Sequence, residues 1–156
     1  GDRNMEQTNL VVTPDGKTWD EVTRDVSYLG NAMIDMRISS THTTASSPVV
    51  FTKVRGSDYG YGKSHKNFAI AYDRFICLVG GSYQISFATI TNTAADVRPT
   101  IYINGVSVAG TIIEVSGNVY DSGSNLVNTY LNRGDYVQMM HYFWDSNWAH
   151  FSITKA

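Results

Sequence analysis

Apolar and polar side chains alternate along most of the chain after residue 32. The alternation is clearest in residues 83–89, where Tyr, Ile, Phe and Thr occupy every second position. A period of two is the pattern of a β-strand that buries one face. Short polar or glycine-containing segments, such as Asn104-Gly105, separate these stretches and are typical of tight turns. The pattern predicts roughly eight or more short strands at the spacing of a β-sandwich.

The end of the chain contains the two segments that are richest in aromatic side chains. Residues 131–144 and 148–153 contain alternating stretches, and the three residues between them, 145–147, are short and polar. Such a connection predicts a terminal β-hairpin. Phe151 lies on one predicted face of the second segment, whereas Trp148 lies on the other. One small sheet cannot bury aromatic side chains on both faces, so the pattern predicts a second sheet against one face and another copy of the chain against the other.

The first third of the chain differs from the rest. Residues 1–47 are predicted to form a stem or collar with a Ser/Thr-rich linker, followed by a head domain of residues 48–156. Thr18 and Glu21 have the spacing of a capping box, and apolar residues then recur at helical spacing. One short helix over residues 19–29 is therefore allowed. An extended conformation of these residues in a fibre stem is the competing interpretation.

Composition narrows the class of protein. A chain of 156 residues is long enough to bury one core, and its formal charge of −2 argues against a nucleic-acid-binding domain. We find no apolar run long enough to cross a bilayer and no signal peptide, so no membrane insertion is expected. Cys77 is the only cysteine, which excludes an intrachain disulfide and indicates synthesis in a reducing cytosol. We expect its thiol to be buried and inert.

Motifs for metal binding and catalysis are weak. The segment 121–125 offers oxygen ligands at alternate positions, but no Glu or Asp completes a cation site, so a polar loop without metal is the favoured interpretation. His141 and His150 are predicted to face each other across the last hairpin as a structural pair. Neither a nucleophile elbow nor a phosphate-binding loop is present. We therefore predict that the chain is not an enzyme and binds no cofactor.

The tripeptide Arg133-Gly134-Asp135 spells an adhesion motif. Three-residue motifs recur by chance, and a glycine followed by an aspartate is common in turns. The favoured interpretation is that Gly134 and Asp135 form the turn that enters the next strand.

Binding through loop aromatics is the more specific functional prediction. Aromatic rings stack on the apolar faces of sugars, while Asn, Asp and Ser side chains bind the hydroxyl groups. The predicted receptor-binding residues lie in or beside expected loops and are Tyr59, Tyr61, Trp144, Asp145, Asn147 and Trp148. The alternative is that several of these rings fill an interface between subunits.

Four elements together resemble the jelly rolls of complement globular heads and tumour-necrosis-factor-like proteins. They are Gly81-x-Tyr83-x-Ile85-x-Phe87, Ile101-x-Ile103-Asn104-Gly105, Leu131-x-x-Gly134-Asp135-x-Val137 and Phe151-Ser152. The resemblance covers residues 48–156. It departs from the family pattern at Ile153, where a glycine is usual, and none of the family's calcium ligands can be matched. The resemblance implies an all-β antiparallel jelly-roll sandwich of about ten strands that assembles as a homotrimer.

Residues 13–25 resemble a segment found in bacteriophage tail fibres and tailspikes shortly before their C-terminal domains. This resemblance implies a trimeric tip that attaches a virion to a bacterial surface glycan or outer-membrane protein. The protein would then be part of the virion tail fibre, made in the cytoplasm of the bacterial host. Two alternatives stay open: a purely structural trimerisation cap of the fibre, and a carbohydrate-binding module.

Overall fold

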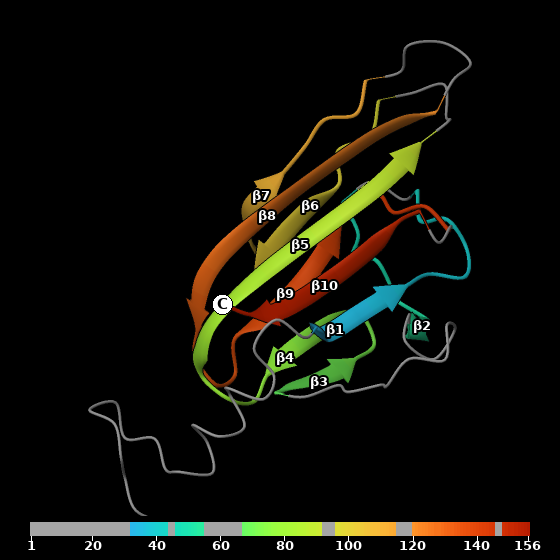
Figure 1. Ribbon diagram of the computed structural model, residues 1–156. Coiled ribbons are helices and arrows are strands. Elements are labelled where there is room, and N and C mark those ends of the chain that lie inside the picture. Colours follow the sequence, from blue (N-terminus) through green and yellow to red (C-terminus); the bar gives the residue numbers. More distant parts are fainter. Residues whose placement is uncertain (1–31, 44–45, 55–66, 92–95, 115–119, 146–147) are drawn as a thin grey trace, which may run out of the picture.

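The computed structural model describes residues 32–43, 46–54, 67–91, 96–114, 120–145 and 148–156. Every regular element in these residues is a strand (Figure 1). The ten strands are β1 (Ala32–Arg37), β2 (Lys53–Val54), β3 (Phe68–Ala71), β4 (Arg74–Cys77), β5 (Gly81–Thr91), β6 (Thr100–Ile103), β7 (Val106–Gly110), β8 (Asp121–Leu131), β9 (Tyr136–Met140) and β10 (His150–Lys155). Among the described residues there is no helix with the length and hydrophobicity needed to cross a bilayer.

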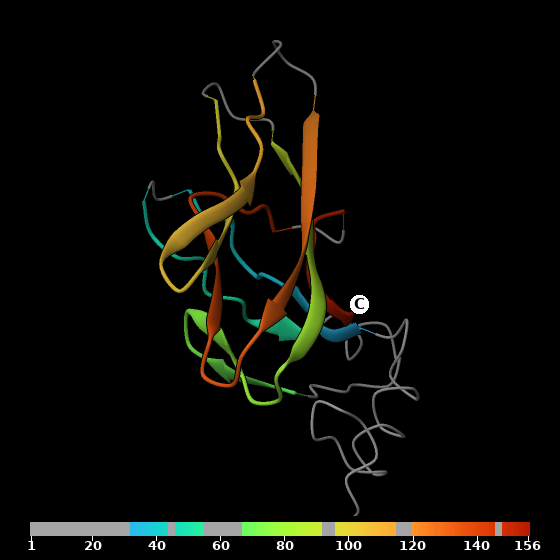
Figure 2. The ribbon, with the colours of Figure 1, turned by 90° about the vertical axis from the view of Figure 1, so that its left-hand side faces the viewer.

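The strands form two antiparallel sheets of five strands each. The first sheet has the order β2-β1-β10-β5-β8, and the second has the order β3-β4-β9-β6-β7. Figure 2 shows the two sheets as separate layers, with β5 and β8 in one and β6, β7 and β9 in the other. The all-β jelly-roll sandwich predicted from the sequence is confirmed.

The core lies between the sheets and follows the period-two pattern. In β5 every second residue from Gly81 to Thr91 is buried, including Tyr83, Ile85 and Phe87. Four phenylalanines occupy the centre: Phe51, Phe75, Phe143 and Phe151. The rings of Phe75 and Phe151 are stacked with their centroids 5.3 Å apart, and Phe51 contacts the other three. This cluster joins both sheets because Phe75 belongs to β4 and Phe151 to β10.

The turn between β6 and β7 is the Asn104-Gly105 turn that the sequence predicts. Both residues have positive φ, 52° and 80° respectively. A two-residue hairpin turn of type I′ requires this conformation at both positions, and Asn and Gly adopt it at low cost. The turn therefore follows directly from the local sequence.

The predicted terminal hairpin is wrong. Strand β9 lies in the second sheet between β4 and β6, whereas β10 lies in the first sheet between β1 and β5. The connection between them passes from one sheet to the other and buries Tyr142 and Phe143 on the way. Short polar residues allow a turn but do not require one, and the buried aromatic residues before them stabilise the crossing instead.

Tryptophan, tyrosine and phenylalanine side chains, expected on both faces of the last strand, occur on only one face of β10. The outer faces of β5 and β10 carry Ser86 and Ser152, whose hydroxyl groups are hydrogen-bonded at 2.9 Å. The apolar residues Phe87 and Phe151 both face the core. The alternation correctly showed which residues of β10 share a face. Trp148, however, precedes β10 and therefore lies on neither face of this strand.

The sandwich begins before residue 48. Strand β1 pairs with β10 on one side and with β2 on the other, so Ala32–Arg37 is an inner strand of the first sheet. The Ser/Thr-rich linker was predicted over residues 39–47, and this segment includes the bridge between His42 and Phe143. A stem in residues 1–31, with the allowed helix over 19–29, lies outside the described residues and stays a prediction.

Candidate functional site

The connection between β9 and β10 builds one end of the sandwich. The backbone N–H of His42 donates to the carbonyl of Phe143 at 2.8 Å, and the N–H of Phe143 donates back at 3.1 Å. The N–H of Trp144 donates to Oγ1 of Thr89 in the first sheet at 3.2 Å. Hydrogen bonds from the backbone of Phe143 and Trp144 to two different segments thus hold this part of the connection and position the aromatic side chains beside it.

Three aromatic side chains contact one another at this connection, and we call them the aromatic cluster. Trp144 and Trp148 belong to the connection, and Tyr120 immediately precedes β8. The ring of Tyr120 lies 5.5 Å from that of Trp144 and 6.4 Å from that of Trp148, and the two indoles are 6.2 Å apart. Trp148 is 62% exposed and Tyr120 58% exposed, whereas Trp144 is half-buried. Exposed aromatic rings in tilted and T-shaped contact present an apolar surface to solvent.

A groove of about 270 Å³ adjoins the aromatic cluster. Trp148 forms one wall, and the floor comes from paired residues of β5 and β8: Ala88 with Ser124, and Ile90 with Ser122. The groove therefore combines one indole face with two serine hydroxyl groups. This combination suits a sugar ring, which has an apolar face and hydroxyl groups at its edge.

The structure describes three of the six predicted receptor-binding residues. Trp144 and Trp148 lie together in the aromatic cluster. Asp145 is exposed beside them, and its Oδ1 accepts a hydrogen bond from the Thr41 hydroxyl at 2.8 Å. Tyr59, Tyr61 and Asn147 lie outside the described residues. The receptor-binding role of all six stays a prediction.

Tyr120 was missed by the sequence reasoning. It lies immediately before β8, next to the segment 121–125 that the sequence predicted to be a polar loop. The aromatic residue itself was visible in the sequence, but its neighbours, Trp144 and Trp148, are more than twenty residues away along the chain. Only the pairing of β8 with β5 brings it to the same end of the sandwich.

The polar loop predicted for residues 121–125 is wrong, because β8 begins at Asp121. Side chains alternate between the faces of a strand, so the oxygen atoms of Asp121, Ser122 and Asn125 cannot converge on one cation. In the part of the chain that the structure describes, no three His, Cys, Asp or Glu residues lie close enough to hold a metal ion.

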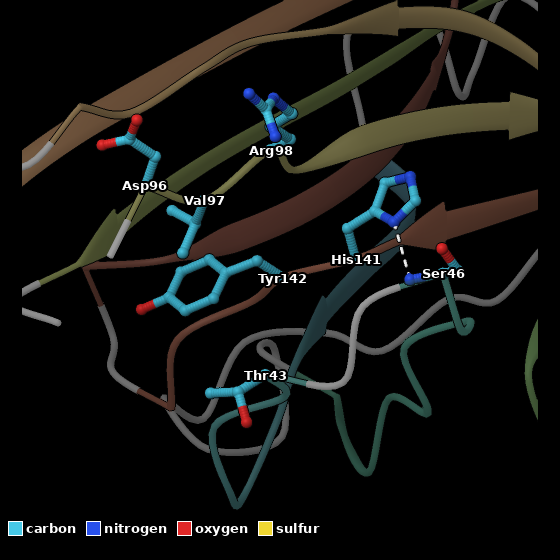
Figure 3. A pocket seen from close by; sticks show the side chains of 7 residues that line it. All are labelled: Thr43, Ser46, Asp96, Val97, Arg98, His141 and Tyr142. Atoms are coloured by element: carbon cyan, nitrogen blue, oxygen red, sulfur yellow. Dashed lines mark hydrogen bonds between the residues drawn. The ribbon is translucent and has the colours of Figure 1, made fainter. Parts of the chain in front are cut away.

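A second cavity, of about 250 Å³, includes His141 and Tyr142 of the same connection in its lining (Figure 3). We call it the His141 pocket. It is lined by Thr43, Ser46, Asp96, Val97, Arg98, His141 and Tyr142. The backbone N–H of Ser46 donates to Nδ1 of His141 at 2.9 Å, and the hydroxyl of Tyr102 lies 3.5 Å from Nε2. The predicted pairing of His141 with His150 across a hairpin is wrong, because His150 belongs to the first sheet.

The environment of His141 favours the neutral imidazole. Burial lowers its pKa below the ordinary 6.5, and the nearby positive charge of Arg98 and the neighbouring His42 lower it further. The hydrogen bond from Ser46 acts in the same direction, because Nδ1 must be unprotonated to accept it.

We expect the free energy of unfolding to fall as the pH is lowered from 7 to 5. The pKa of His141 is lower in the folded protein than the ordinary 6.5 of the unfolded chain, so the unfolded chain binds more protons between these two pKa values. The contribution of neutral His141 to the free energy of unfolding is therefore complete above pH 6.5, and it is lost as the pH falls through the pKa of the folded protein. Urea denaturation at several pH values should show a weaker pH dependence in His141→Asn, which tolerates positive φ. His150→Asn is the control. If the free energy of unfolding of His141→Asn depended on pH as strongly as that of the parent chain, His141 would not be the cause of the pH dependence.

The Arg133-Gly134-Asp135 segment forms the turn between β8 and β9, as the favoured interpretation predicted. Gly134 has a φ of 96°. The carboxylate of Asp135 accepts hydrogen bonds from the Asn132 backbone N–H at 2.8 Å and from Nδ2 of Asn104 at 3.0 Å. Asp135 thus links this turn to the β6–β7 turn by a hydrogen bond. Both of its carboxylate oxygens accept hydrogen bonds from within the protein.

Replacing Asp135 by alanine should lower the free energy of unfolding by about 1–3 kcal/mol, because two hydrogen bonds to a charged group are lost. Arg133→Ala, in the same turn, is exposed and should change it by less than about 0.5 kcal/mol. Urea titrations of both variants measure the difference. Equal effects would show that the carboxylate does not stabilise the turn.

Solved structures with a similar fold were found, whereas no protein-family model and no curated protein matches the sequence. The globular domain of the zebrafish complement 1qA protein superposes with a TM-score of 0.59 at 18% identity, covering 78% of this chain and 94% of that one. Murine APRIL, solved at pH 5.0, superposes with a TM-score of 0.63 at 10% identity, covering 79% and 97% respectively. The chain therefore has the jelly-roll fold of complement globular heads and tumour-necrosis-factor-like proteins. At these identities the likeness concerns the fold alone.

Proposed function

We propose that this chain is a binding domain whose aromatic cluster recognises a saccharide of a bacterial surface, and that it forms the tip of a phage tail fibre or tailspike. The observation that carries the binding role is the exposure of Trp148 and Tyr120 beside a groove with serine hydroxyl groups. The tail-fibre context is supported by residues 13–25, which resemble the segment preceding the C-terminal domains of such fibres. In this proposal the domain acts by attachment and needs no catalytic step.

The groove selects for a ring with one apolar face. A sugar stacked on the Trp148 indole directs its edge hydroxyl groups toward Ser122 and Ser124, on the outer face of β8. Asp145 is the residue after Trp144, and it can accept hydrogen bonds from further hydroxyl groups through the carboxylate oxygen that the Thr41 hydroxyl does not contact. Each of these contacts is weak, so tight attachment needs several copies of the site.

A homotrimer supplies those copies. Leu126 and Tyr130 are large exposed residues on β8, and they share the outer face of the first sheet with the groove floor. An exposed apolar strip of this kind is typical of a surface that is covered on assembly. We expect light scattering to give about three times the chain mass of 17.3 kDa at micromolar concentration. A monomeric mass would contradict the trimer.

A structural trimerisation cap is the second candidate function. The same outer face favours it, because Leu126, Tyr130 and the aromatic cluster could all be buried against the next copy. In that case the indoles stabilise the assembly, and recognition belongs to another part of the fibre.

Single alanine substitutions of Trp148 and Trp144 distinguish the two functions. Trimer mass and binding to an array of bacterial surface polysaccharides are measured for each variant. If the cluster recognises a saccharide, Trp148→Ala keeps the trimer and loses about tenfold or more in binding, because exposed tryptophans often dominate binding energy. The control is Tyr72→Asn, which removes an exposed aromatic residue from the β3–β4 turn and, at a φ of 51°, suits the backbone there.

Dissociation of the Trp148→Ala trimer would assign the aromatic cluster to assembly. Unchanged mass together with unchanged array binding would remove the cluster from both functions and contradict the proposal.

A further inference from the structure

We infer that the His141 pocket is a second binding site, separate from the aromatic cluster, and that it takes a sugar that carries a carboxylate group. Its lining residues come from three segments far apart in the sequence, represented by Ser46, Arg98 and His141. Figure 3 shows their side chains arranged around one hollow. The inference does not depend on the aromatic cluster, whose residues do not line this pocket.

Two hydrogen-bond donors in the pocket match a carboxylate. The Arg98 side chain is exposed, and the structure gives its guanidinium no ion pair among the described residues. A guanidinium binds a carboxylate through two parallel hydrogen bonds. Because Nδ1 of His141 accepts from the Ser46 N–H, the neutral ring carries its proton on Nε2. The Tyr102 hydroxyl is a long contact of this nitrogen, at 3.5 Å, so a ligand carboxylate competes with a weak hydrogen bond for the proton.

The other residues that line the pocket restrict the charge of the ligand and the groups that surround its carboxylate. Asp96 places a negative charge in the same pocket as Arg98, so a ligand with a single negative charge fits better than a dianion such as phosphate. The Thr43 hydroxyl can bind a sugar hydroxyl, and Val97 and Tyr142 supply an apolar wall. A sugar acid combines one carboxylate, several hydroxyl groups and an apolar ring face.

The backbone at the pocket is held in an unusual conformation. Ser46 and His141 have positive φ values of 60° and 80°, and the two residues are hydrogen-bonded to each other. Non-glycine residues adopt this conformation at a cost, and such residues cluster at binding sites. Here the conformation aims Nδ1 of His141 at Ser46 and places Nε2 near the hydroxyl of Tyr102. This arrangement is present before any ligand arrives.

The test is an amide NMR titration of the full chain with sodium D-glucuronate. D-glucose is the matched neutral sugar, and inorganic phosphate is the matched anion without hydroxyl-bearing carbons. We expect millimolar glucuronate to shift the amide signals of Ser46 and His141, while glucose and phosphate at the same concentrations shift them at least about tenfold less. Equal shifts with phosphate or with glucose would overturn the inference.

Variants locate the binding. Arg98→Gln should weaken glucuronate binding about tenfold or more, and His141→Asn should weaken it while tolerating the positive φ. Arg133→Gln removes an exposed arginine outside the pocket and should bind as the parent chain does. Parent-like binding by Arg98→Gln, or loss of binding in Arg133→Gln, would overturn the assignment to this pocket.

Discussion

Replacing Phe151 by alanine is expected to lower the free energy of unfolding by about 3–5 kcal/mol. Its ring is fully buried and stacks on Phe75 across the two sheets, with the centroids 5.3 Å apart. Phe51 packs against it at the same centroid distance. The truncation removes the contact that joins the sheets and leaves a cavity between them. Because typical domains are stable by only 5–15 kcal/mol, urea denaturation should show a large fall in the midpoint.

Two matched variants control this prediction. Phe151→Leu keeps most of the volume and should cost clearly less than the alanine variant. Leu78→Ala removes an exposed apolar side chain and should change the free energy of unfolding by less than about 0.5 kcal/mol. If Phe151→Ala cost no more than Leu78→Ala, the phenylalanine cluster would not be the centre of the core.

Replacing Asn67 by leucine is expected to cost about 2–5 kcal/mol for two separate reasons. Asn67 has a φ of 66°, which asparagine tolerates and leucine does not, a penalty of about 1–2 kcal/mol. Its buried Nδ2 donates to the hydroxyl of Tyr83 at 3.1 Å, and that hydroxyl donates to the carbonyl of Val79. Losing the hydrogen bond from Asn67 inside the core costs about a further 1–3 kcal/mol.

Asn67→Gly separates these two contributions. Glycine accepts the positive φ but lacks the amide, so Asn67→Gly should show only the loss of the side chain. Tyr83→Phe removes the same hydrogen bond from the other partner. In a double-mutant cycle, Asn67→Gly and Tyr83→Phe should therefore be less costly together than the sum of their separate costs. Strict additivity would show that the two side chains act independently.

The fold could be predicted from the sequence to the extent that it depends on local patterns. Alternation in Tyr83, Ile85 and Phe87 identified core-facing residues, because a strand between core and solvent must alternate. The Asn104-Gly105 turn was predictable because few residue pairs adopt positive φ twice. Such signals depend on residues within a few positions of each other.

Strand pairing could not be predicted in the same way. Strands β9 and β10 are close in sequence, yet they lie in different sheets because the buried side chains of Tyr142 and Phe143 favour the crossing. The His141 pocket could not be predicted from the sequence for the same reason. Ser46 and His141 are brought together by the pairing of distant segments, and nothing in either local sequence indicates that contact. Of the aromatic cluster, the two tryptophans were predictable and Tyr120 was not.

The central position of β10 in the first sheet has a consequence for the order of folding. Its neighbours β1 and β5 do not pair with each other, so during synthesis they remain without their common partner until residues 150–155 have left the ribosome. Until then β5 can pair only with β8, and β1 only with β2. Contacts between distant segments slow folding, and open strand edges promote aggregation while they persist. We therefore expect ribosome-stalled chains that expose residues only up to 145 to remain sensitive to protease, and chains that expose residue 156 to become resistant.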